Sequence, residues 1–346
     1  MSKSAEALAR RERRLRELGV DQQLRRVNAA LRQVWEQDGS KRPDPVRLRH
    51  EFLLASKQGE QIVPAPMSLL LNPRGIALRF YLLAVFEAQC RLDSGAEWAS
   101  ARLLGGSMGW RDFIAIDAAY DSTTERYMRK TKQGRKLDSS RLRQIQGALR
   151  TFEDMDGQAL VEVPRKENGQ HRDYGAFVLM RETGRGVLPT ANRYRVPTLS
   201  EFTVDIPRDF FLHGWASVLY PTEIATWLTL RFLAARFPGV HNESGVYLYG
   251  EDREQWFGLG RDAYEDSCSM LLDIGLIRPA QRRTPPSEVA PPGTDFNTLL
   301  ASIDFSQPSQ PNRYEAHRYQ LTDEGLREDA LEVCLKEVVH RRNESN

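Results

Sequence analysis

Basic side chains that could neutralise phosphate are concentrated in one stretch of the sequence. Residues 126–150 contain nine Lys or Arg residues and a single acid, Asp138, whereas the whole chain of 346 residues has a formal net charge of only +2. Cations that pair with DNA phosphates gain affinity by releasing counterions. The stretch therefore predicts a nucleic-acid contact, and the alternative interpretation is a solvated basic face without a partner.

Side chains that could read base edges lie in the later part of this stretch. In the major groove of DNA, Arg pairs with guanine and Gln pairs with adenine. The predicted base-contacting residues are Arg141, Arg143, Gln144 and Gln146. The predicted phosphate-contacting residues are Arg126, Arg129, Lys130, Lys132, Arg135, Lys136, Arg150, Arg165, Lys166 and Arg172.

A helix must position the base-contacting side chains. Four apolar residues, Leu142, Ile145, Leu149 and Phe152, recur at spacings of three, four and three, which places them on one helix face. Ser139 and Ser140 are the expected N-caps, because their hydroxyl oxygens can accept from the first free backbone N–H groups. The other faces of this helix then present Arg and Gln.

Two helices are expected before this one and a hairpin after it. The dense apolar run 75–92 predicts a buried helix, capped by Asn72 with Pro73 at its first position. A second helix is expected within 110–119. Two β-prone runs, 159–163 and 174–180, flank an Asn-Gly pair and predict a hairpin, and 192–196 is a candidate for a further strand.

A second unit repeats this order later in the chain. The sequence predicts helices over 221–237, 251–257 and 261–274, strands at 246–249, from 276 and over 314–321, and a final helix to about residue 339. The intervening segment 279–311 is rich in Pro, Ser, Thr and Gln, so we expect a mobile wing there.

The run from Leu259 to Ile277, LGRDAYEDSCSMLLDIGLI, resembles the helix-turn-helix core of winged-helix DNA-binding proteins. Its closing positions are Leu272, Gly275, Leu276 and Ile277. Tandem units of this kind behind a linker helix resemble plasmid replication-initiator proteins and some transcriptional regulators. The resemblance implies two DNA-binding domains.

The helix expected over 261–274, which would be the second recognition helix, departs from this pattern, because it carries Asp262, Glu265, Asp266 and Asp273. Phosphate would be repelled there, so no base contact is assigned to it.

The fold class expected is mainly α with small β-hairpins (α+β). Two winged-helix domains follow an N-terminal helical extension, because the chain is too long for one comfortable core. The expected ranges are 1–66 for the extension, 67–200 for the first domain and 201–346 for the second, which includes the wing and the C-terminal helix.

The remaining composition predicts a cytoplasmic protein without a cofactor. The three cysteines, Cys90, Cys268 and Cys334, form no zinc-type pair and suit a reducing compartment. No signal peptide is recognisable, and the most apolar run is interrupted by Arg79 and Glu87. The six histidines form no metal-binding motif, and the glycines near residue 106 lack the lysine of a phosphate-binding loop.

The function predicted is binding of double-stranded DNA by a homodimer, in replication initiation or transcription regulation on a mobile element such as a plasmid. One alternative is an adaptor whose winged-helix units bind other proteins. A second alternative is a metal-dependent nuclease, in which Glu153, Asp154 and Asp156 would hold Mg²⁺. We expect no enzymatic activity.

Overall fold

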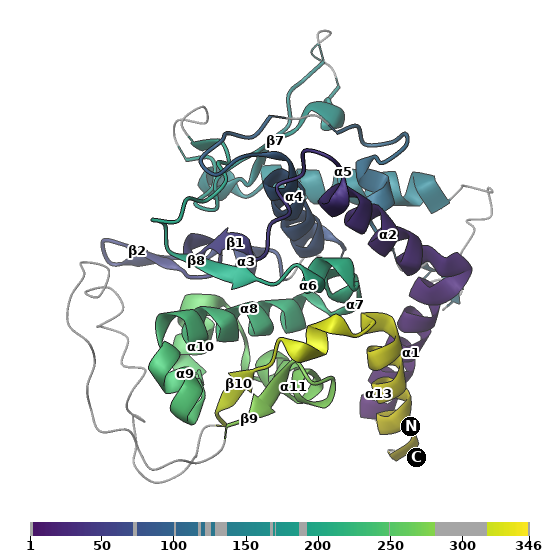
Figure 1. Ribbon diagram of the computed structural model, residues 1–346, viewed down its shortest axis with the longest axis vertical. Coiled ribbons are helices and arrows are strands. Elements are labelled where there is room, and N and C mark those ends of the chain that lie inside the picture. The colour runs from purple at the N-terminus through teal and green to yellow at the C-terminus, as the bar shows by residue number, and fades with distance from the viewer. Residues whose placement is uncertain are drawn as a thin grey trace.

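The computed structural model is mainly helical, with small antiparallel two-stranded sheets (Figure 1). It describes residues 3–71, 75–99, 102–116, 119–121, 126–128, 137–166, 169, 171–186, 192–248, 250–280 and 317–344. The described residues form two halves that share one continuous hydrophobic core, with α4 and α5 in the upper half of Figure 1 and α8 and α11 in the lower half.

In the first half, the central helix is α4 (Ala77–Arg91), which is buried along nearly its whole length. Helix α5 (Leu137–Glu153) packs on it, and the rings of Phe80 and Phe152 stack between the two helices. Strands β6 (Val161–Glu162) and β7 (Val178–Leu179) then form the predicted hairpin.

The second half is built around α8 (Pro221–Arg236), against which α11 (Arg261–Asp273) packs. Between them come α9 (Pro238–Ser244) and α10 (Gly250–Phe257). Helix α11 is capped just beyond Asp273 by Gly275, whose φ of 72° allows the N–H groups of Gly275 and Leu276 to bond to carbonyls of the last turn. This cap leads into β9 (Ile277–Pro279), which pairs with β10 (Tyr319–Leu321).

The N-terminal segment contacts both halves. Helix α1 (Lys3–Gly19) lies along α13 (Ala330–Glu344) in the second half. Helix α2 (Gln23–Glu36) crosses to the first half, and β1 (Val46–Arg49) pairs with β8 (Thr203–Ile206). The segment predicted as an extension is therefore packed into the body, while the domain boundaries at 66 and 200 stay predictions.

The remaining elements are short. The helices are α3 (Pro66–Leu69), α6 (Asp209–Leu212) and α7 (Trp215–Val218), and the 3₁₀ turns are η1 (Val20–Gln22), η2 (His50–Phe52), η3 (Trp110–Phe113), η4 (Asp156–Gln158), η5 (Tyr174–Ala176) and η7 (Glu324–Arg327). The strands are β2 (Ser56–Gln58), β3 (Gln61–Val63), β4 (Ala119–Asp121) and β5 (Arg126–Met128).

Several predicted elements differ from those observed. The strand expected at 246–249 is only an isolated bridge at Val246 in the described residues. The helix expected within 110–119 is only the 3₁₀ turn η3, because the backbone becomes extended at Ile114. The N–H and carbonyl of Ile116 then bond to the side-chain amide of Gln23. The third helix begins at Leu137, two residues before its predicted Ser139 cap. The predicted cap at Asn72 and most of the predicted wing lie outside the described residues.

Candidate nucleic-acid interface

Helix α5 presents part of the predicted base-contacting set to solvent. Of the predicted apolar face, Ile145, Leu149 and Phe152 are buried and Leu142 is half-buried. Arg143 and Arg150 are exposed, and Gln144 and Gln146 are half-buried. Arg143 and Arg150 are seven residues apart, so they lie two turns apart on one side of the helix.

Arg141 is placed differently from its prediction. Its residue is only 8% exposed, and its Nη2 donates to Oε1 of Gln23 in α2 at 3.0 Å. Burial lowers the pKa of this guanidinium, while the nearby carboxylate of Asp138 opposes the shift. In this structure α2 covers the side chain of Arg141, so Arg141 is not part of the exposed surface of α5, and its base contact stays a prediction.

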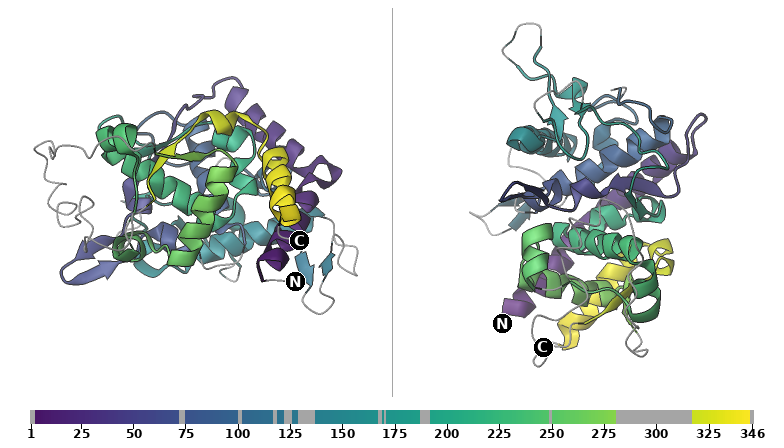
Figure 2. Two further views of the ribbon diagram at one scale, coloured as in Figure 1. Left: turned by 90° about the horizontal axis from the view of Figure 1, so that it is seen from below. Right: turned by 90° about the vertical axis from the view of Figure 1, so that its left-hand side faces the viewer.

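The β6–β7 hairpin adds a second group of cations next to α5. Arg165, Lys166 and Arg172 are exposed. The backbones of Arg165 and Arg172 form an isolated β-bridge across the hairpin. Nε of Arg172 lies 2.7 Å from Oε2 of Glu153, which joins the hairpin to the last turn of α5. The hairpin projects from the body in Figures 1 and 2.

One of the remaining predicted phosphate contacts lies in a described strand. Arg126 is in β5, opposite Asp121 of β4. Outside the described residues lie Arg129, Lys130, Lys132, Arg135 and Lys136. The candidate surface therefore consists of the exposed face of α5 and the neighbouring hairpin.

Helix α11, which packs on the buried helix α8, has the opposite charge. Asp262, Glu265 and Asp266 are exposed along it, and Arg261 Nε lies 2.9 Å from Oε1 of Glu265. Asp273, in its last turn, forms an ion pair with Arg341 of α13. The acidic face read from the sequence is thus on the surface.

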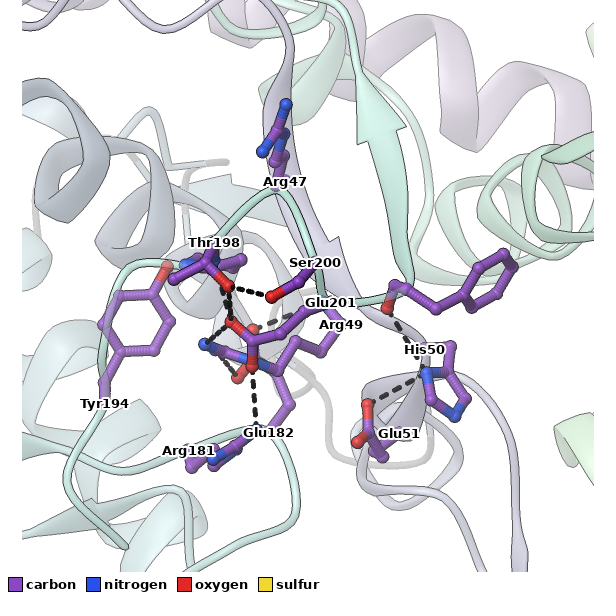
Figure 3. Close-up of polar contacts among 12 residues, drawn as sticks. Arg47, Arg49, His50, Glu51, Arg181, Glu182, Tyr194, Thr198, Ser200 and Glu201 are labelled. Atoms are coloured by element: carbon purple, nitrogen blue, oxygen red, sulfur yellow. Dashed lines mark hydrogen bonds and ion pairs between the residues drawn. The ribbon is translucent and has the colours of Figure 1, made fainter. Parts of the chain in front are cut away.

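A buried ion-pair cluster, shown in Figure 3, holds β1 against the first half. Nη1 of Arg49 lies 2.8 Å from Oε2 of Glu182, which is fully buried. Nε and Nη2 of Arg49 donate to the two oxygens of Glu201 at 2.7 and 3.0 Å. Hydrogen bonds from Arg49 lower the pKa of Glu201 to about 2. The cluster connects segments far apart in sequence, so no local pattern predicts it.

Neighbouring side chains close the free edge of β1. The side-chain amide of Gln89 accepts from the backbone N–H of Arg47 at 2.9 Å and donates to its carbonyl at 2.6 Å. The same amide donates to the hydroxyl of Tyr194. These bonds occupy the backbone groups of Arg47 that a third strand would otherwise use. The buried cluster and these bonds therefore stabilise the fold, and we do not assign them a binding site.

The residues of the nuclease alternative are partly engaged elsewhere. Glu153 pairs with Arg172, as described above. Within the described part of the chain, no group of three or more His, Cys, Asp or Glu side chains is arranged to hold a metal ion. The three cysteines are all buried as free thiols.

Comparison with known proteins identifies no relative, because no protein-family model, curated protein or solved structure matches the chain. None of the helices described is long and apolar enough to cross a membrane.

Proposed function

We propose that the protein binds double-stranded DNA through the exposed face of α5 and the β6–β7 hairpin. The observation that carries the proposal is that two exposed basic surfaces, one on α5 and one on the hairpin, are held next to each other. Arg143 and Arg150 lie on one side of α5, and the Arg172–Glu153 ion pair fixes the basic hairpin beside the end of this helix. A helix and an adjacent β-ribbon are the elements that fit the grooves of DNA.

We further propose that each half is a winged-helix domain. The order in the first half is α4, a bridge residue at Glu97, η3, the paired strands β4 and β5, α5 and then the β6–β7 hairpin, and Glu97 pairs with Arg195 after the hairpin. The order in the second half is α8, α9, a bridge residue at Val246, α10, α11, β9 and β10, and Val246 pairs with Tyr319. In both halves, a bridge residue between the central helix and α5 or α11 pairs with a segment that follows α5 or α11, which supports a common plan.

A role in replication initiation or transcription regulation on a mobile element follows as part of the proposal, as does a homodimer. Paired copies of α5 would read paired half-sites on the DNA. The rival function, a protein-binding adaptor, is favoured by the acidic face of α11, which does not suit phosphate. We propose that the protein is not an enzyme.

The experiment is a DNA-binding titration at several salt concentrations, with a fragment from upstream of the protein's own gene and a random duplex. The variant is Arg143→Ala with Arg150→Ala. We expect the slope of log affinity against log salt to fall by about 0.9 for each phosphate contact removed.

The matched control removes the same charge from exposed positions in the second half, with Arg327→Ala and Lys336→Ala. This control should bind as the wild type does. Unchanged binding by the α5 variant would refute the role of α5, and binding that is insensitive to salt in the wild type would favour the protein adaptor.

A further inference from the structure

Two arginines lie on one face of the β9–β10 ladder in the second half. The register pairs Arg278 of β9 with Gln320 of β10. Arg318 comes two residues before Gln320, and its carbonyl accepts from Ala280 N–H at 2.9 Å, which continues the ladder. Because side chains alternate along a strand, Arg278, Gln320 and Arg318 project from the same side.

Neutral groups hold both guanidinium groups in place. Nε of Arg278 donates to Oε1 of Gln320 at 3.1 Å. Nη1 of Arg318 donates to the hydroxyl of Ser244 at 3.2 Å, and its guanidinium lies 4.4 Å from the centre of the Tyr247 ring. Gln320 in turn donates to the carbonyls of α9. The two cations are therefore positioned without the use of a carboxylate.

No carboxylate of the described residues forms an ion pair with Arg278 or Arg318. Other arginines of this half differ, because Arg231 pairs with Asp323 and Arg261 pairs with Glu265. A guanidinium has five N–H donors, and these two retain donors that can reach an anionic oxygen.

The segments next to this face carry one histidine and two carboxylates, His241, Glu243 and Asp323. Burial, together with Arg231 and Arg278, lowers the pKa of His241, whose Nε2 accepts from the Leu321 N–H at 2.9 Å. Glu243 is exposed on the same short helix α9, and the ion pair with Arg231 occupies Asp323.

We propose that the second half contacts the phosphate backbone of DNA through Arg278 and Arg318 on the β9–β10 ladder, and that the acidic helix α11 takes no part. This inference rests on the proposed DNA-binding function. It assigns the contact in this half to strands, because the exposed carboxylates of α11 repel phosphate and the two arginines attract it. Since phosphate contacts carry no sequence information, this contact adds affinity for any duplex.

The test is the same salt titration with Arg278→Gln and Arg318→Gln combined, which removes two charges while keeping polar side chains. We expect the salt slope to fall by about 1.8, or about 0.9 per contact, with an equal loss of affinity for the native fragment and for the random duplex. A matched control, Arg327→Gln with Lys336→Gln, removes two charges from exposed positions of the second half that lie outside α11 and should change neither quantity.

A second variant separates charge from disturbance of the ladder. Arg278→Lys with Arg318→Lys keeps the charge and should keep the wild-type slope. Loss of the slope in this variant too would overturn the proposal, as would an unchanged slope in the Gln variant. If Arg143→Ala with Arg150→Ala weakens binding but the Gln variant does not, this inference fails while the proposed function stands; if the wild type binds no DNA, both fail.

Discussion

The two halves share a central buried helix followed by a second packed helix and a pair of strands, yet the packed helices α5 and α11 carry opposite charges. The solvent side of α5 bears Arg143 and Arg150, whereas that of α11 bears Asp262, Glu265 and Asp266. Both helices pack an apolar face on a central buried helix, α4 or α8. Burial therefore accounts for the shared order, and the exposed positions are free to differ. Similar architecture in two halves does not imply the same partner for both.

The halves also differ in how the N-terminal segment is attached to them. In the first half, β1 is fixed through Arg49, Glu182 and Glu201. In the second half, α1 inserts Arg11, which forms a buried ion pair with Glu223 at the start of α8. Each attachment depends on a buried arginine, and the predictions below test how far these attachments and the two helix surfaces differ.

The largest effect is expected from Arg49→Met. This change leaves the carboxylate of Glu182 fully buried without its cation, and breaking a buried ion pair in this way costs about 3–5 kcal/mol of unfolding free energy. Urea denaturation measures the loss. Arg47→Met, a half-exposed arginine on the same strand, should cost less than about 1 kcal/mol. Equal losses in the two variants would show that the buried pair has no special role.

A smaller loss is expected from Gln23→Ala, which tests the attachment specific to α5. The side chain of Gln23 bonds the N–H and carbonyl of Ile116 and accepts from Arg141. Its removal leaves buried polar groups without partners, at about 1–3 kcal/mol. Gln33→Ala, at an exposed position of the same helix, is the control and should be nearly neutral in denaturation. A neutral Gln23→Ala would contradict the described packing of α2 against α5.

Neutralising α11 should then raise DNA affinity modestly. Asp262→Asn with Asp266→Asn removes two exposed negative charges, and we expect a gain of up to about ten-fold at low salt that shrinks as salt screens the charges. Glu328→Gln with Glu332→Gln removes the same charge elsewhere in this half. Equal gains in affinity from the two double variants would mean that the net charge of the protein matters and that the location of the removed charges on α11 does not.

The smallest effect concerns the acid limit of stability. Hydrogen bonds from Arg49 hold the pKa of Glu201 at about 2, below its ordinary 4.5. A carboxylate with a depressed pKa stabilises the fold above its ordinary pKa, and this contribution is lost as pH falls from 4.5 toward 2. Glu201→Gln should therefore flatten the decline of unfolding free energy in this range, while Glu97→Gln, at a more exposed carboxylate, should not. Parallel pH curves for Glu201→Gln and the wild type would contradict the assignment.

Periodicity predicted the helices well and the surface of α5 only in part. Because Ile145, Leu149 and Phe152 recur at helical spacing, the core face of α5 could be read before its neighbours were known. Arg141 is four residues before Ile145 and so lies near the same face, a signal that could have excluded it from the exposed set. What no spacing contains is the position of α2, whose Gln23 covers Arg141.

Contacts between distant segments could not be predicted either, because they also depend on how separate elements pack. The pairing of Arg49 with Glu182 and that of Arg11 with Glu223 join residues more than a hundred positions apart. A single sequence gives the types of these residues but no constraint on which of them meet. The acidic face of α11 could be read correctly, since it depends only on exposed positions of one helix.

The packing of α1 along α13 has a consequence for the order of events during synthesis. The ribosome releases α1 long before α13, so α1 has to wait for this partner helix. Until α13 emerges, the side of α1 that packs on it stays uncovered, although α2 follows α1 directly and contacts it early. The α1–α13 contact therefore closes a very long loop, and it is expected to form late in folding.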